Sequence, residues 1–85
     1  KITGLYFGAN QISGAIPAAL ENLINLIVLG MENNHFTGTI PTNFGKFQKM
    51  QGISLSRNKL SGKIPSSIGN LTRLAVLLLY QNNLE

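Results

Sequence analysis

The chain has 85 residues and no cysteine, so it forms one small domain at most and has no disulfide or thiol chemistry. Its net charge of +4 comes from scattered Lys and Arg residues, which do not form the basic patch typical of nucleic-acid-binding proteins. The longest apolar run, residues 74–80, is far shorter than the roughly 20 residues of a membrane-spanning helix. We therefore expect neither nucleic-acid binding nor membrane insertion by this segment.

A repeat of 24 residues organises the sequence. The segments GANQISGAIP, ENNHFTGTIP and SRNKLSGKIP recur at this spacing, and a fourth copy begins as YQNNLE. A fixed period of this size is typical of repeat proteins, in which each repeat packs only against its neighbours. We expect about three and a half stacked repeats, with no polar cap at either end. Their boundaries are expected near residues 1–22, 23–46, 47–70 and 71–85.

Each repeat is expected to begin with a turn and a short strand. The spacing of Leu71, Leu74 and Leu77 is close to three, which favours a 3₁₀ or helical turn leading into the strand. Leu77 and Leu79 alternate at period two, which directs both side chains to one face of a strand. Apolar residues occur at the same places in the earlier repeats, and they predict a core between the stacked repeats. These positions are Ile2, Leu5, Phe7, Ile12, Ile16, Leu20, Leu23, Leu26, Leu29, Met31, Phe36, Ile40, Phe44, Phe47, Met50, Ile53, Leu55, Leu60, Ile64 and Ile68.

An asparagine follows the strand in every repeat, and we expect it to stabilise a sharp inward turn. Such a turn removes backbone N–H and C=O groups from water, so these groups need other partners. The asparagine side chain offers both donors and an acceptor. The sequence therefore predicts a structural ladder, rather than a ligand-binding role, for the asparagines at this position. They are Asn10, Asn34, Asn58 and Asn82.

A Gly-x-Ile-Pro element closes each of the three complete copies. The glycine permits a backbone conformation that side chains disfavour, and the proline ends strand pairing and begins the next turn. The Ser or Thr before each glycine favours a second, short strand. The glycines are Gly14, Gly38 and Gly62, and the prolines are Pro17, Pro41 and Pro65.

Few side chains are suited to catalysis or metal binding. The single histidine, His35, is expected to be an exposed loop residue, and the glutamates Glu21, Glu32 and Glu85 fall in different repeats. They do not form a paired carboxylate site, a nucleophile with its base, or a metal-ligand cluster. No phosphate-binding motif is present. We therefore expect this segment to be neither an enzyme nor a metal or cofactor site.

Binding is expected on the concave face of the strands, where residues between the core positions point. Arg57 is suited to pair with an acidic group and Glu32 with a basic one. The repeats differ most just ahead of the asparagine, at Ser56 and Arg57 in the third copy. Four adjacent strands span roughly 14 Å, which fits part of an extended peptide better than a small molecule. The predicted ligand-binding residues are Tyr6, Glu32, Arg57, Val76, Leu78 and Tyr80.

Asn70 begins the sequence Asn70-Leu71-Thr72, the only N-glycosylation sequon of the chain. It lies on the expected return segment, outside the concave strands. In a secreted protein we expect a glycan on Asn70 that projects from the side of the solenoid.

The combined pattern LxxLxxLxLxxNxLxGxIPxxLGxL, present over essentially all 85 residues, resembles the plant-type leucine-rich repeat. The resemblance implies an α/β horseshoe. Its solenoid is expected to be a right-handed superhelix with a parallel β-sheet on the concave face, short second strands, and 3₁₀ or loop returns. Glu21 departs from the pattern, since Gly45 and Gly69 occupy its place in other repeats. The paired cysteines that cap the extracellular domains of proteins with this repeat are absent.

The segments SIGNLTRL and ENLINL are similar to the ectodomains of plant receptor-like kinases, especially those that sense microbial patterns. This implies recognition of a peptide or protein ligand in defence signalling, with recruitment of a co-receptor. It also implies a location on the extracellular side of the plasma membrane. The membrane span and Ser/Thr kinase of that family are not in this sequence.

Two alternative functions remain from the sequence. Similar repeats occur in secreted plant inhibitors of microbial polygalacturonases, which act in the apoplast. An ice-binding surface is a third class, but it needs a regular polar row, and the concave residues are irregular.

Overall fold

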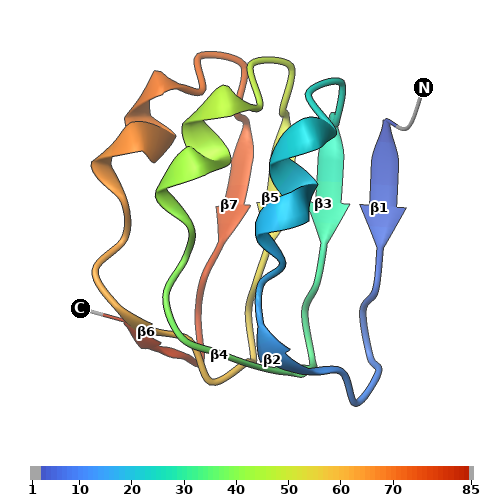
Figure 1. Cartoon of the computed structure of the whole chain (residues 1–85), viewed down its shortest axis with the longest axis vertical. Helices are drawn as coiled ribbons and strands as arrows, with labels where there is room; N and C mark the ends of the chain where they lie inside the picture. Colours follow the sequence, from blue (N-terminus) through green and yellow to red (C-terminus); the bar gives the residue numbers. More distant parts are fainter. Residues whose placement is uncertain (1–2, 85) are drawn as a thin grey trace.

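The computed structural model describes residues 3–84, apart from the side chain of Ala18, as a coil of four stacked levels (Figure 1). Each level begins with a three-residue strand, and these strands form one parallel sheet in the order β1-β3-β5-β7. Each strand residue pairs with the residue one repeat later, as Leu5 does with Leu29. The constant period therefore sets the register of the whole sheet. The strands are β1 (Gly4–Tyr6), β3 (Val28–Gly30), β5 (Gly52–Ser54) and β7 (Val76–Leu78).

Short second strands follow the asparagine turns, as the sequence predicted, and they pair as β2-β4 and β6-β8. Their bounds are β2 (Ser13–Ala15), β4 (His35–Thr37), β6 (Ser61–Gly62) and β8 (Asn83–Leu84). The chain then returns along the side opposite the main sheet (Figure 1). His35 is exposed, as expected, but it is the first residue of β4 rather than a loop residue. Its N–H donates to the Ile12 carbonyl oxygen at 2.8 Å.

The return segments contain the 3₁₀ helices η1 (Ala18–Asn22), η2 (Thr42–Lys46) and η3 (Ser66–Asn70). Each helix begins directly after a proline of the Gly-x-Ile-Pro element, such as Pro65 with φ −61°. The helices therefore lie earlier in the repeat than the leucine spacing predicted. Single turns of the same type continue beyond η3, because Leu71 N–H donates to Ile68 and Leu74 N–H donates to Leu71. The period of three thus reflects turns that run on towards the strand.

The glycines of this element adopt the backbone conformation that was predicted for them. Gly14, Gly38 and Gly62 have φ of 92°, 80° and 78°, a region that other residues rarely occupy. At Gly62 a Cβ atom would also lie 2.9 Å from Cγ2 of Thr39. Glycine is therefore required there both by backbone conformation and by the close approach of the neighbouring level.

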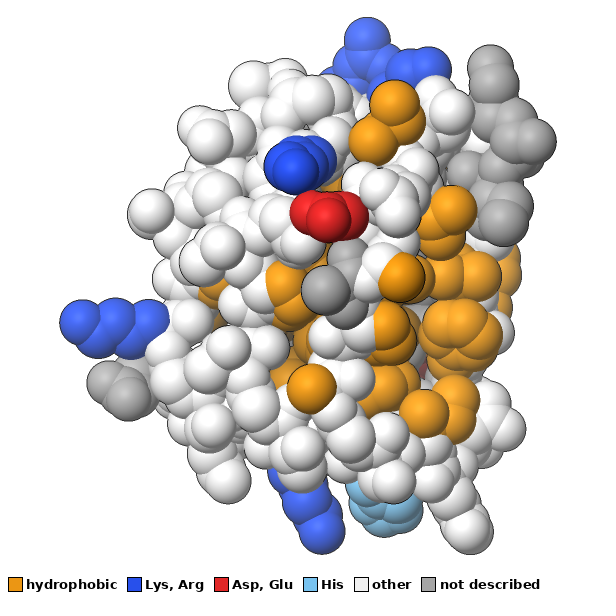
Figure 2. All heavy atoms as spheres, viewed as in Figure 1, with side chains coloured by type: hydrophobic (Ala, Val, Ile, Leu, Met, Phe, Trp, Pro, Cys, Tyr) orange, Lys and Arg blue, Asp and Glu red, His pale blue; other side chains and the backbone are white. Residues whose placement is uncertain are grey.

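The core lies between the main sheet and the returns, and most of the predicted apolar positions are buried. Three of the described ones are exposed, since Ile12, Ile64 and Leu77 are 37%, 42% and 36% exposed. Ile2 lies outside the described residues, and the partly buried positions are Leu5, Phe7, Leu23, Leu74, Leu79 and Leu84. Ile12 and Leu77 belong to the first and fourth levels of the described stack, and Ile64 follows β6, the last second strand that another described strand covers. In Figure 2 apolar side chains accordingly gather towards the side of the molecule on which β1 lies. The buried apolar residues are Ile16, Leu20, Leu26, Leu29, Met31, Phe36, Ile40, Phe44, Phe47, Met50, Ile53, Leu55, Leu60, Ile68 and Leu71.

Glu21 links the first two return helices, which accounts for its departure from the repeat pattern. Its Oε2 accepts hydrogen bonds from Asn43 Nδ2 at 3.0 Å and Lys46 Nζ at 3.3 Å. Figure 2 shows this face, where an acidic side chain lies beside a basic one. The Asn43 hydrogen bond and then Lys46 hold the pKa of the Glu21 carboxyl below its ordinary value of 4.5. A glycine at this position, as in the other repeats, cannot form this link.

A left-handed residue precedes the ladder asparagine in every level. Ala9, Asn33 and Arg57 have φ of 58°, and Gln81 has 57°. Asparagine tolerates this conformation because its short polar side chain bonds locally, whereas alanine is strained by its Cβ atom. Ala9 is therefore less suited to this conformation than an asparagine would be.

Ala9→Asn is expected to stabilise the fold by about 0.5–1 kcal/mol, because it relieves this strain. The midpoint of urea unfolding measures the effect. Ala75→Asn is the matched control, since Ala75 is also exposed and has no positive φ. Both residues donate a backbone N–H to a neighbouring level, Ala9 at 3.0 Å and Ala75 at 2.8 Å. Equal shifts in the two variants would contradict the explanation from strain.

Candidate ligand-binding surface

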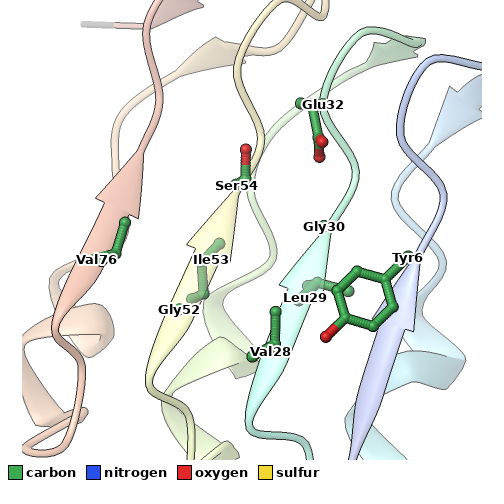
Figure 3. A pocket seen from close by; sticks show the side chains of 9 residues that line it. All are labelled: Tyr6, Val28, Leu29, Gly30, Glu32, Gly52, Ile53, Ser54 and Val76. Carbon is green, nitrogen blue, oxygen red and sulfur yellow. The ribbon is translucent and has the colours of Figure 1, made fainter.

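The concave sheet carries a shallow hollow of about 310 Å³ (Figure 3). Its floor includes two glycines on adjacent strands, Gly30 at the end of β3 and Gly52 at the start of β5. A Cβ atom at Gly52 would meet nothing within 4 Å, so the space above this residue is open. Gly52 thus leaves part of the hollow empty, whereas the lack of a side chain at Gly30 makes room for neighbouring side chains. The residues that line it are Tyr6, Val28, Leu29, Gly30, Glu32, Gly52, Ile53, Ser54 and Val76.

Three of the six predicted ligand-binding residues, Tyr6, Glu32 and Val76, line this hollow. Figure 3 shows the Tyr6 ring reaching from β1 towards β3, and the Glu32 side chain pointing towards Gly30. Both meet above Gly30, where a Cβ atom would lie 3.3 Å from Glu32 Oε1 and 3.5 Å from Tyr6 Cδ1. The structure thus brings a carboxylate and an aromatic ring to the same edge of the hollow.

Sequence reasoning did not single out Val28, Gly30, Gly52 or Ser54 as binding residues. A signal was available, since glycine within a strand weakens the strand and often marks a site of close approach by a ligand or another backbone. The three-residue strands β3 and β5 each contain one glycine. The sequence could not show that these two glycines lie on the floor of one continuous hollow.

Arg57, Tyr80 and Gln81 form a second group on the neighbouring levels. Arg57 Nε donates to Gln81 Oε1 at 2.8 Å, and the Arg57 guanidinium carbon lies 5.6 Å from the centre of the Tyr80 ring. Arg57 therefore already has two partners within the chain. Leu78 and Tyr80 are 40% and 52% exposed, and they lie on and just after the edge strand β7. Their role in ligand binding stays a prediction.

The exposure of Ser56 differs from the prediction. It was predicted to be accessible to a partner together with Arg57, but it is 1% exposed. Its Oγ atom has no hydrogen-bond partner among the described residues. Ser56 is therefore covered, and only Arg57 of this pair is available at the surface. Asn70, the predicted glycosylation site, is exposed at the end of η3.

The ladder asparagines bond the levels to one another. Asn34 Nδ2 donates to Phe7 O of the preceding level at 2.7 Å, and its Oδ1 accepts from Ile12 N–H at 3.2 Å. Asn82 repeats both bonds, to Leu55 O at 2.9 Å and from Leu60 N–H at 3.0 Å. Asn10 instead bonds carbonyls of its own turn, at Phe7 and Gly8. The ladder holds the concave strands at a fixed spacing.

Two further properties concern residues 3–84 alone. This part of the chain contains no helix long and apolar enough to cross a membrane. It also contains no group of three His, Cys, Asp or Glu side chains placed to hold a metal ion.

Comparison with known proteins identifies the repeats. The family model described as Leucine Rich Repeat matches residues 25–47 and 49–71, which together make up more than half of the chain. No curated protein sequence matches the chain significantly.

Solved structures are similar over nearly the whole chain. A chain of the Arabidopsis thaliana BIR3–SERK2 complex is 37% identical, with a TM-score of 0.94, and the match covers 98% of this chain and 45% of that one. The plant peptide hormone receptor RGFR1 in complex with RGF2 is 34% identical, with a TM-score of 0.95 and coverage of 98% and 13%. A plant ice-binding protein is 31% identical, with a TM-score of 0.95 and coverage of 98% and 27%.

The present chain thus spans less than half the length of each of these structures. The parallel sheet, the second strands and the 3₁₀ returns are the architecture expected for the plant-type repeat. The chain belongs to the leucine-rich repeat family and is a repeat segment of the plant receptor-like kinase type.

Proposed function

We propose that these repeats form part of the extracellular recognition surface of a plant receptor-like kinase and bind an extended peptide or protein segment on the concave sheet. The hollow above Gly30 and Gly52 is the observation that carries this proposal. Exposed Tyr6 and Val76 border it, and exposed apolar side chains on a sheet are suitable binding anchors. Neighbours of the same fold include the BIR3–SERK2 complex and a peptide hormone receptor, which supports a peptide ligand and a protein co-receptor.

The proposal includes a role in defence signalling, which is supported by the similarity of SIGNLTRL and ENLINL to receptors of microbial patterns. It also includes attachment of the complete receptor to the plasma membrane. We further propose an N-linked glycan on Asn70, because Asn70 and Thr72 of the sequon are both exposed. Mass spectrometry of the protein expressed in plant cells tests this, and an unmodified Asn70 would contradict it.

Gly52→Leu is the direct test of binding at the hollow. Peptides selected from a displayed random library on the intact protein would be the ligands. A Cβ atom at Gly52 meets no atom within 4 Å, so a leucine side chain there can extend into the hollow. We expect peptide affinity to fall by about tenfold or more, which corresponds to about 1.4 kcal/mol. Tyr80→Ala is also expected to weaken binding if the peptide extends along β7.

Gly69→Leu is the matched control, because a Cβ atom at Gly69 also meets nothing within 4 Å and Gly69 lies on η3, away from the sheet. Its affinity for the peptides should be unchanged. If Gly52→Leu bound as tightly as the original protein, the ligand would bind a lateral or convex surface and the proposal would be wrong.

A further inference from the structure

We infer that the hollow receives a lysine or arginine side chain of the bound peptide, whose cationic group lies between the Glu32 carboxylate and the Tyr6 ring. This inference rests on the proposed function, since it concerns the chemistry of a peptide on the concave sheet. It goes further by stating which type of side chain the hollow selects. The argument depends on one carboxylate oxygen, one aromatic ring and the apolar remainder of the hollow.

Glu32 Oε1 is buried and has no hydrogen-bond partner among the described residues. It lies 3.3 Å from the position of a Cβ atom at Gly30, on the floor of the hollow, and 3.2 Å from the corresponding position at Gly8. Burial of a carboxylate oxygen without a hydrogen-bond donor is unfavourable. A hydrogen bond from a cationic donor compensates for this cost more strongly than one from a neutral donor. The terminal torsion of glutamate is soft, so a small rotation turns Oε1 towards an incoming group. The carboxylate is thus placed to accept from a ligand.

The Tyr6 ring provides the second contact. A cation within about 6 Å of a tyrosine ring centre is attracted to the ring face. In the described residues the Tyr80 ring already has such a partner, because Arg57 lies 5.6 Å from its centre. Tyr6 has no partner of this kind in the same residues, and it is 71% exposed at the edge of the hollow. Of these two tyrosines, Tyr6 is therefore the one available to a cation from a ligand.

The remaining wall suits the aliphatic part of a lysine or arginine side chain. Val28 and Val76 line the hollow on either side of the open space above Gly52. Long basic side chains pack their methylene groups on such apolar surface while their charged ends stay in polar surroundings. The chain as a whole carries a net charge of +4, which repels cations at long range. The selectivity must therefore arise from the local contacts with Glu32 and Tyr6.

Two small probes separate the cationic contact from apolar filling of the hollow. They are N-acetyl-lysine methylamide and N-acetyl-norleucine methylamide, which share the aliphatic chain but differ in the ammonium group. The intact protein is labelled with nitrogen-15 glycine, and the amide signals of Gly30 and Gly52 are followed by NMR during titration. We expect saturable shifts of both signals with the lysine probe, and at least fivefold weaker binding of the norleucine probe. Added salt should weaken the lysine probe only.

Glu32→Gln keeps the shape of the side chain and removes its charge, so we expect it to abolish the preference for lysine. Glu21→Gln is the matched control, because Glu21 lies on η1, away from the sheet, and its loss should leave the preference unchanged. The inference is wrong if both probes bind equally, if neither binds, or if Glu32→Gln retains the preference. Peptides that lose binding in Gly52→Leu but show no basic preference would support the proposed function and overturn this inference alone.

Discussion

Phe47→Ala is expected to destabilise the fold by about 3–5 kcal/mol, the range for removal of a large aromatic side chain from a core. Phe47 is 0% exposed, and its ring centre lies 5.3 Å from that of Phe44 at an interplanar angle of 59°. Tilted aromatic pairs of this kind add to the free energy of burial. Alanine would leave a cavity between two levels of a stack in which each level packs only against its neighbours. Urea unfolding of the intact protein measures the change.

Two control variants separate the cavity from other causes. Phe47→Leu restores the leucine of the repeat pattern and should cost less than about 1.5 kcal/mol, because it largely keeps the apolar volume. Ile24→Ala removes a side chain that is 56% exposed and should change stability by no more than about 0.5 kcal/mol. If Phe47→Ala were no worse than Ile24→Ala, the two phenylalanines would not form a core between levels.

Asn58→Ala is expected to destabilise the fold by at least about 3 kcal/mol, because it leaves several buried backbone groups without partners. Asn58 Nδ2 donates to Met31 O at 2.9 Å, Leu55 O at 3.0 Å and Ser56 O at 3.2 Å. Its Oδ1 accepts from Phe36 N–H at 3.1 Å. Alanine can replace none of these bonds, and the site is too well covered for water to replace them all. The side chain thus connects two levels and closes its own turn.

Asn10→Ala is the control for this prediction. Asn10 is exposed and bonds only Phe7 O and Gly8 O within its own turn. Its replacement should cost about 1 kcal/mol or less, since water can reach the groups that it leaves. Equal losses in the two variants, measured by urea unfolding, would mean that turn formation rather than bonding between levels explains the asparagines.

Much of the fold follows from the repeat itself. Because the period is constant, residues one repeat apart must lie side by side, and this predicted the parallel strands and the shared position of the asparagines. The conformations of Gly62 and Pro65 could be predicted from their residue types alone. Glycine readily adopts positive φ, and proline has a fixed φ and no N–H with which to continue a strand. The spacing of Leu71 and Leu74 predicted turns that lead into the strand, and their N–H groups form such turns, but it did not show that the 3₁₀ helix lies earlier, at Ser66–Asn70.

The sequence by itself therefore determined the type of solenoid, its register and the direction of its main side chains. Tertiary structure alone decided what those side chains meet. Ser56 became buried, Arg57 met Tyr80, and Glu32 turned towards Gly30 with one oxygen left unpartnered. The reason is that a repeat pattern states which face a residue occupies. The length, rotamer and charge of its neighbours on adjacent levels decide which surface remains open.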